Sequence, residues 1–477
     1  MTTEQLRAPA GEARHWHEGD GAAAYFRAKY LGTYPGKKLM YFLLAIAIFG
    51  LAWQSVEESI TGAALTGGLD ASLHMSSVEE AWMLVAATLA MVAIYPISGP
   101  ITDRMGRKQA IVYGLIGFII CDLVKAFSTD YAMFVAGRVI EGILVMFTVP
   151  PTLALVRDFT PRLSRGVGYG LVAAGGWGLG VLLSDWLSSP ILGLARGLSL
   201  FGLTGPWRWL YIFYAVIAAL GALLEGLFLK DLPLMLRVRR RGLEVSSEAE
   251  ALEAEREDRG SVVTAIKNYL SKPRMWVIYS NQWFWGMCWT GLLTFMPSII
   301  VATAGASAST ATFLAGFVWV AYAVSAFGLG FVLDIFHVRK TVNIIGMLGV
   351  AVTVAFFATR VLGTHASTTE LIIVFLLIGA FAGAQYPSFA ICVAGESERI
   401  NPTGVASSFA FYWITAQLVS IIPQYLFPVF GAHPGGWRTA MLLMAAGALL
   451  SAPTLAAAHG PYKPRLRLPK EMEESYY

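Results

Sequence analysis

Four ionisable residues lie inside long apolar runs of this 477-residue chain. Glu57 and Glu58 fall in one run, and Arg138 and Glu141 fall in another. Ionisable side chains are expensive in a hydrocarbon layer, so those that occur there are functional candidates by default. A carboxyl group can bind and release a proton, and a neighbouring guanidinium favours its ionised form. The chemistry that these residue types predict is therefore proton binding and release.

Membrane-spanning helices must position these groups. The chain is 56% hydrophobic and 14% charged, with a mean hydropathy of +0.59. A run of roughly 20 apolar residues crosses a bilayer core as a helix. We predict twelve spans, at 39–61, 81–101, 109–127, 131–155, 167–187, 207–229, 275–300, 310–333, 341–362, 370–393, 404–429 and 437–458.

Other polar residues lie near the ends of these spans and are expected to be solvated there. We expect this of the ionisable residues Asp122, Lys125, Asp185 and Glu225. Tryptophans favour the membrane interface, and the sequence places Trp53 and Trp285 in such a belt.

Lysine and arginine are distributed unevenly among the loops. They are frequent before the first span and after the second, fourth and sixth spans, and they are sparse in the alternate loops. Short cytoplasmic loops are enriched in these residues, so both termini are expected in the cytoplasm of a multi-pass plasma (inner) membrane protein. This bias accounts for the net charge of +4 without a nucleic-acid partner. Residues 1–36 lack the apolar core of a signal peptide.

The link after the second span has a specific pattern. It runs from Gly99 to Lys108 as G-x-x-x-D-R-x-G-R-K. Topology alone would explain its basic residues, but not Asp103 or the two glycines. The pattern resembles the loop between helices two and three of the major facilitator superfamily. That resemblance implies an all-α membrane protein of twelve helices, in two pseudo-symmetric six-helix bundles that alternate access to a central cavity.

The resemblance also implies a conformational latch. In this family the loop aspartate, here Asp103, holds the two bundles together against the N-terminal end of a helix in the other half. The matching end here is that of span eleven, near residues 401–404. Asp334 is expected to form a weaker counterpart, because its loop lacks the second glycine. The expected latch residues are Gly99, Asp103, Arg104, Gly106, Arg107, Lys108 and Asp334.

The chain also repeats itself. Asp103 and Asp334 are 231 positions apart, and the Trp-Arg pairs that begin at Trp207 and Trp437 are 230 positions apart. A shared offset predicts two similar halves with a cavity between them. The expected parts are a cytoplasmic tail at 1–38, bundles at 39–229 and 275–458, a cytoplasmic linker at 230–274, and a second cytoplasmic tail at 459–477.

The fourth span is similar to a further element of the family, R-x-x-x-G, at Arg138 to Gly142. The resemblance implies that this arginine takes part in proton coupling and that spans one and four border the cavity. We therefore expect Glu57 or Glu58 to pair with Arg138 and to release it on protonation. The alternative is a static buried ion pair. The fifth span lacks the Gly-Pro pair of drug/proton antiporters, and its glycines predict close helix packing.

The second half offers amides and aromatic rings in place of charges. Such groups can hydrogen-bond and stack on a solute without the penalty of a buried charge. The candidates for substrate binding are Asn281, Gln282, Trp283, Trp289, Gln385, Tyr386, Tyr412, Trp413 and Gln417.

These features predict a proton-coupled symporter of a small organic solute. An organic anion is favoured because Arg138 offers a positive charge, and a sugar or another neutral metabolite comes next. Proton-driven efflux and uncoupled facilitation are the alternatives within transport. A polytopic membrane enzyme is disfavoured, because the sequence has no metal-ligand set, nucleophile elbow or phosphate loop. We expect a monomer in the lipid bilayer that needs no metal or cofactor other than the coupling proton.

Overall fold

Nine stretches of the chain are described by the computed structural model, namely 15–17, 20–160, 165–236, 246–247, 249–251, 253, 267–363, 366–400 and 405–463. Within them, twelve helices are long and apolar enough to cross a membrane. The predicted twelve-helix, all-α architecture is therefore confirmed. The basic run of the linker, Arg239 to Arg241, lies outside the described residues.

The N-terminal half contains six spans, one of them built from three consecutive helical segments. A π-helix, η2, interrupts the glycine-rich fifth span between α7 and α8. The elements are β1 (His15–Trp16), α1 (Ala22–Arg27), β2 (Tyr30–Leu31), α2 (Lys37–Thr66), α3 (Leu69–Ser72), α4 (Ser77–Met105), α5 (Arg107–Ala126), α6 (Tyr131–Phe159), α7 (Arg165–Leu171), η2 (Val172–Leu179), α8 (Gly180–Leu194), β3 (Ser199–Leu200), β4 (Leu203–Thr204) and α9 (Pro206–Phe228).

The C-terminal half repeats this plan, again with π-helical segments inside spans. Its elements are α13 (Pro273–Thr290), η3 (Gly291–Phe295), α14 (Met296–Ala304), α15 (Ala308–Phe336), α16 (Arg339–Phe356), η4 (Phe357–Val361), α17 (Thr368–Ala382), α18 (Gln385–Ile400), α19 (Val405–Gly431), α20 (Gly436–Ser451) and the 3₁₀ turn η5 (Thr454–Ala457).

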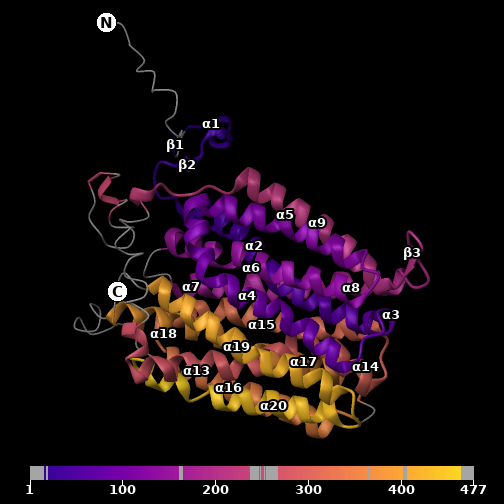
Figure 1. Cartoon of the computed structure of the whole chain (residues 1–477). Helices are drawn as coiled ribbons and strands as arrows, with labels where there is room; N and C mark the ends of the chain where they lie inside the picture. The colour runs from indigo at the N-terminus through magenta and orange to yellow at the C-terminus, as the bar shows by residue number, and fades with distance from the viewer. Residues whose placement is uncertain are drawn as a thin grey trace, which may run out of the picture.

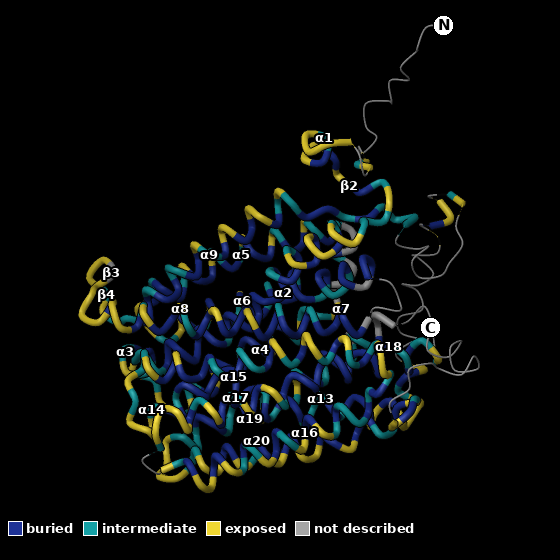
Figure 2. The backbone as a smooth tube through the Cα atoms, turned by 180° about the vertical axis from the view of Figure 1, so that it is seen from behind, coloured by how far each residue is buried: buried dark blue, intermediate teal, exposed yellow. Residues whose placement is uncertain are grey.

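The two halves lie side by side with their helices along a common direction, as Figure 1 shows. We name the ends of this bundle by their elements. The α7 end carries α7 and α18, and the β3 end carries α3, α14 and the β3–β4 hairpin. Figure 2 shows buried residues along the helices at the centre and exposed residues on outward faces such as those of α9 and α20. Large exposed apolar side chains, such as Leu223 on α9 and Leu449 on α20, suit contact with lipid.

The predicted loop pattern lies mostly on helices. The helix α4 continues to Met105 and α5 begins at Arg107, so Gly106 alone joins them. Its φ of 90° is a conformation that L side chains rarely adopt. The second predicted span ends at 101, before the end of α4, and the third begins at 109, after the start of α5. The difference arises because a helix can continue past the apolar residues that define a span.

Glycine allows the closest helix approaches. A Cβ added at Gly142, the glycine of the R-x-x-x-G element, would lie 2.1 Å from the Ala87 carbonyl oxygen of α4. A Cβ at Gly62 of α2 would lie 2.2 Å from the Thr294 carbonyl oxygen, in the other half. These contacts fit the small-residue packing of helices in membranes.

The two halves touch at both ends of the bundle. At the α7 end, the Asp334 carboxylate accepts hydrogen bonds of 2.8 Å from the backbone N–H groups of Gly166 and Val167. At the β3 end, the hydroxyl groups of Ser189 and Ser309 lie 3.1 Å apart.

Candidate functional site: a central cavity and a buried charge cluster

A cavity lies between the halves. The N-terminal half contributes residues of α2 and η2, and the C-terminal half contributes residues of α13, α15, α18 and α19. Its lining is Gln54, Ser55, Glu58, Trp177, Gln282, Trp285, Gly286, Trp289, Thr290, Tyr322, Gln385, Tyr386, Trp413, Ala416, Gln417, Ser420 and Gln424.

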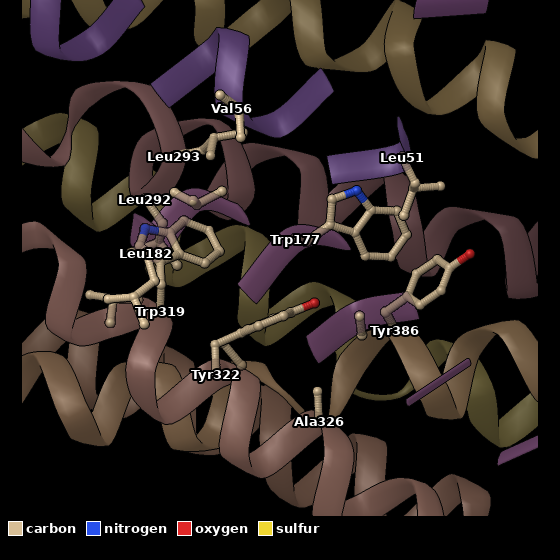
Figure 3. Close-up of a cluster of buried hydrophobic side chains, with 14 of the residues drawn as sticks. Leu51, Val56, Trp177, Leu182, Leu292, Leu293, Trp319, Tyr322, Ala326 and Tyr386 are labelled. Atoms are coloured by element: carbon tan, nitrogen blue, oxygen red, sulfur yellow. The ribbon is translucent and has the colours of Figure 1, made fainter. Parts of the chain in front are cut away.

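Aromatic rings from both halves meet in this lining. Trp177, on the π-helix η2, packs its ring 4.1 Å from that of Tyr386 and 6.4 Å from that of Trp413, measured between centroids. Figure 3 shows Trp177 beside Leu51 and Tyr386, with Tyr322 directed toward the same space. The indole nitrogen of Trp413 is buried and has no hydrogen-bond partner among the described residues. Its N–H group therefore lacks an acceptor within the described part of the chain.

Amide groups form the polar part of the lining. The Gln385 amide nitrogen donates to the Asn281 side-chain oxygen at 2.9 Å and to the Gln282 side-chain oxygen at 2.8 Å. Asn281 in turn donates to the Thr454 hydroxyl at 2.9 Å. In the same region, the Thr88 hydroxyl of α4 donates to Gln424 at 2.9 Å. Asn281 and Thr88, which do not line the cavity, thus help to orient Gln385 and Gln424.

Glu58 provides the one carboxylate among the described lining residues, and none of those residues is Lys, Arg or His. Gln54 lies one turn earlier on α2 and lines the cavity beside it. Arg138 exerts an electrostatic attraction on Glu58, but no salt bridge joins the two in the described part of the chain. The cavity therefore carries a single acidic group among neutral ones.

The other predicted charges belong to a separate buried cluster in the N-terminal half. The Lys125 ammonium contacts carboxylate oxygens of Glu57 at 2.5 Å, Asp122 at 2.8 Å and Glu141 at 2.9 Å. The Arg138 guanidinium pairs with Glu141 and donates to the Thr61 hydroxyl at 3.1 Å. We call Glu57, Asp122, Lys125, Arg138 and Glu141 the charge cluster.

Two predictions about these charges were wrong. Arg138 pairs with Glu141 of its own helix, and Glu57 pairs with Lys125, so the expected pair between a glutamate of α2 and Arg138 is not formed. Arg138 also does not line the cavity, which removes the reason for favouring an organic anion.

The residues expected to be solvated at span ends are buried. Asp122, Lys125 and Glu225 are 0% exposed, and Asp185 is 2% exposed. The position of a residue along a helix indicates its depth in the membrane. It does not indicate whether neighbouring helices cover the face of the helix on which that residue lies. Trp53 and Trp285 are likewise buried, and Trp53 donates to Glu57 at 3.0 Å. They are therefore not interfacial.

Some of the predicted substrate-binding residues lie on helix faces that line the cavity, and others do not. The lining includes Gln282, Trp289, Gln385, Tyr386, Trp413 and Gln417, whereas Asn281, Trp283 and Tyr412 lie outside it. Trp283 instead donates to the Thr415 hydroxyl at 2.9 Å, and Tyr412 packs against Phe389. Whether the lining residues bind a solute remains a prediction.

Several lining residues were missed. Gln54 precedes Glu58 by four positions, and Trp285 precedes Trp289 by four, a spacing that places each pair on one helix face. Ser420 and Gln424 extend the face of Trp413 and Gln417 on α19 in the same way. Helical spacing was therefore the available signal. Trp177 had none, because the sequence does not reveal the π-helix that carries it.

The latch candidates are placed only in part. Gly99 lies within α4, while the side chains of Asp103 and Arg104 and the whole of 401–404 lie outside what the structure describes. Arg107 pairs with Asp158 of α6 in the same half. The Lys108 backbone N–H donates to Asp231 at 3.2 Å, next to Gly106. Of the described latch side chains, Asp334 reaches the other half.

A family model described as Major Facilitator Superfamily matches residues 40–319, more than half of the 477 residues. The chain belongs to the Major Facilitator Superfamily. The family expected from the loop pattern is thereby confirmed. The solute and the coupling ion of this chain are separate questions.

Curated relatives in this superfamily match over part of their length. A triacylglyceride transporter of Mycolicibacterium smegmatis (strain ATCC 700084 / mc(2)155) is 32% identical over 153 residues, 31% of this chain and 26% of that protein. Multidrug resistance protein 2 of Bacillus subtilis (strain 168) is 25% identical over 159 residues, 33% of this chain and 37% of that protein. The chain thus matches between 26% and 37% of the length of these relatives.

A solved structure extends the likeness in fold over most of the chain. The proton:xylose symporter XylE, bound to 6-bromo-6-deoxy-D-glucose, has a TM-score of 0.68 at 15% identity, covering 88% of this chain and 96% of that one. At this identity the likeness shows the superfamily fold alone.

Proposed function

We propose that this transporter exchanges protons for an amphipathic organic cation, with Glu58 as the group that both ligands share. The observation that carries the proposal is the charge of the cavity: one carboxylate, six aromatic rings and no basic side chain among its described lining residues. A cation gains from the faces of tryptophan and tyrosine as well as from a carboxylate. An anion would meet only repulsion from Glu58.

Exchange follows from competition at one site. A cationic solute binds Glu58 in its ionised form, and a proton neutralises the same carboxylate, so each ligand displaces the other. Each bound form then favours the conformational change, because neither leaves an uncompensated charge on Glu58 in the cavity. We assign the α7 end to the cytoplasm from the lysine and arginine bias, so a proton that enters from the β3 end would drive the cation out.

The similarity to a protein named for multidrug resistance supports this direction of transport. The missing Gly-Pro pair in the fifth span distinguishes the chain from drug/proton antiporters of the usual pattern. A π-helix occupies that span instead, and it places Trp177 in the cavity.

A second candidate is proton-coupled symport of a neutral polar solute. It is favoured by the five glutamines that line the cavity, because amides can both donate and accept hydrogen bonds to hydroxyl groups. Glu58 would then bind the proton together with the solute.

Transport in proteoliposomes with an imposed pH gradient tests the proposal. Tetraphenylphosphonium is a suitable cationic probe, and xylose a suitable neutral one. With acid inside, an antiporter accumulates the cation, and Glu58→Gln abolishes this accumulation. Accumulation of xylose with acid outside, and no gradient-driven movement of the cation, would instead support symport.

The matched control is Glu370→Gln, at an exposed position in the capping box of α17. Glutamine also serves in that motif, so this variant should transport like the wild type. Unchanged accumulation of the cation by Glu58→Gln would contradict the proposed role.

A further inference from the structure

The charge cluster does not balance. It contains three carboxylates and two cations, and each of the five side chains is at most 4% exposed. None of them lines the cavity. With every group ionised, the cluster would hold one uncompensated negative charge away from water. Such a charge is strongly destabilising in a protein interior.

The excess lies on Glu57 and Asp122. The Glu141 oxygens are each paired, one with Arg138 and one with Lys125. Lys125 has three N–H donors, and contacts with Glu57, Asp122 and Glu141 account for them. Oxygen atoms of Glu57 and Asp122 lie within 4.8 Å of each other. Within the cluster, Glu57 and Asp122 each contact one cation, and it is the same Lys125 ammonium. No second cation of the cluster pairs with either carboxylate.

Three buried atoms of the cluster have no hydrogen bond to the described residues: the Asp122 Oδ1 and Oδ2 atoms and the Arg138 Nε atom, of which Oδ1 lies in the salt bridge to Lys125. The Asp122 Oδ2 atom is fully buried and has no hydrogen bond or salt bridge to the described residues. The Glu57 Oε1 atom, by contrast, accepts from the Trp53 indole at 3.0 Å. A buried, unpartnered carboxylate oxygen needs a ligand or a proton.

Among the described residues, the surrounding elements bring no further cation into contact with the carboxylates of the pair. Toward the pair, α5 presents the Cys121 thiol, and α9 presents Tyr211 and Tyr214. The Tyr211 ring lies 4.5 Å from the Lys125 ammonium. The helix α6 presents Arg138 and Glu141, which are already paired. The cations contacting the cluster in the described part of the chain are thus Lys125 and Arg138.

We propose that the charge cluster is a second proton-binding site, in which one proton is shared between the carboxyl groups of Glu57 and Asp122. The protonated carboxyl donates to the other carboxylate, and the cluster becomes neutral. The adjacent glutamates then have different tasks. Glu58 faces the cavity, where ligands exchange, and Glu57 faces away from it and retains its proton near neutral pH. This inference stands on the charge count and does not depend on which solute is carried.

Infrared spectroscopy of the purified, lipid-reconstituted protein tests the site directly, because the C=O stretch of a protonated carboxyl is separate from that of a carboxylate. Near neutral pH, we expect Asp122→Asn and Glu57→Gln each to lose the intensity of one protonated carboxyl. Asp122→Asn keeps the size of the side chain and leaves a charge cluster with two carboxylates, Glu57 and Glu141, and two cations, which balance without a proton. The matched control is Asp130→Asn, at the exposed N-cap of α6, where asparagine caps as well as aspartate.

Thermal unfolding provides a second measurement that does not rely on band assignment. Alkaline pH should destabilise the wild type as the shared proton is removed, whereas Asp122→Asn should not show this loss. Equal carboxyl intensity in wild type, Asp122→Asn and Glu57→Gln would overturn the proposal. Loss of the band from the wild type on addition of Na⁺ would also overturn it, because the site would then hold a metal cation.

Discussion

The Asp334 carboxylate accepts a 2.8 Å hydrogen bond from the backbone N–H of Gly166, across the boundary between the two halves. A second bond of equal length comes from Val167. These N–H groups belong to the first turn of α7, where the helix has no backbone acceptors of its own and carries partial positive charge. The C-terminal half thereby holds the fifth span of the N-terminal half at the α7 end.

Asp334→Asn should weaken this contact. Charge-assisted bonds at a helix N-terminus contribute about 1 to 2 kcal/mol, so the population open at the α7 end should rise roughly tenfold. Distances between spin labels on one helix of each half at that end measure the change. Glu370→Gln serves again as the control, and an unaltered distance distribution in Asp334→Asn would refute a role in closure.

Gly62→Ala should have the opposite effect on the bundle. The added Cβ would lie 2.2 Å from the Thr294 carbonyl oxygen, so α2 and η3 must separate and the β3 end should open. The matched control is Gly226→Ala, because an added Cβ at Gly226 meets nothing within 4 Å and alanine is favoured in helices. Labels at the β3 end should report a longer distance for Gly62→Ala only.

Trp177→Ala should weaken binding of a cationic probe about tenfold, because a buried cation–π contact contributes on the order of 1 to 2 kcal/mol. Titration calorimetry with tetraphenylphosphonium measures this loss. Trp186→Ala is the comparison, since Trp186 packs against Phe313 and does not line the cavity. Similar losses in both variants would mean that Trp177 acts through packing alone.

The sequence predicted the helices better than the faces they present. Twelve apolar runs and one loop pattern were enough for the architecture, because lipid exposure demands continuous apolar helices. Glu58, Gln282 and Trp413 were found as cavity candidates from residue type, and four-residue spacing could have added Gln54 and Trp285. Single residues such as Asn281 and Tyr412 were misassigned because type does not specify the direction of a side chain.

The charge cluster shows the other limit. Lys125 lies at the last turn of α5, where a helix end is commonly solvated, and its burial arises from helices distant in sequence. Arg208 of α9 covers this region by donating to the carbonyl oxygens of Ala126 and Ser128. No local pattern around Lys125 encodes that cover. Its three carboxylate partners were therefore beyond prediction from a single sequence.

Exchange at Glu58 makes a prediction about charge movement. If one proton replaces one monovalent cation at Glu58 while Glu57 and Asp122 keep their shared proton, no net charge crosses the membrane. Tetraphenylphosphonium also crosses the bilayer without a protein, and that flux follows the membrane potential. The part of its transport that Glu58→Gln abolishes should be insensitive, at a fixed pH gradient, to a potassium diffusion potential set with valinomycin. An increase of that part with the potential would mean that more than one proton is exchanged.

Lys125→Met should be among the most destabilising single substitutions in the N-terminal half. It removes a contact from Glu57, Asp122 and Glu141 at once, and breaking a buried ion pair by removing one partner costs about 3 to 5 kcal/mol. Thermal unfolding in detergent measures the loss, with Lys272→Met at an exposed helix cap as the control. Adding Glu57→Gln and Asp122→Asn to Lys125→Met should recover much of the stability, because Arg138 and Glu141 then balance each other. If the triple variant is no more stable than Lys125→Met, the lost stability reflects the packing of the lysine chain, against which Gly137 of α6 lies, and not its charge.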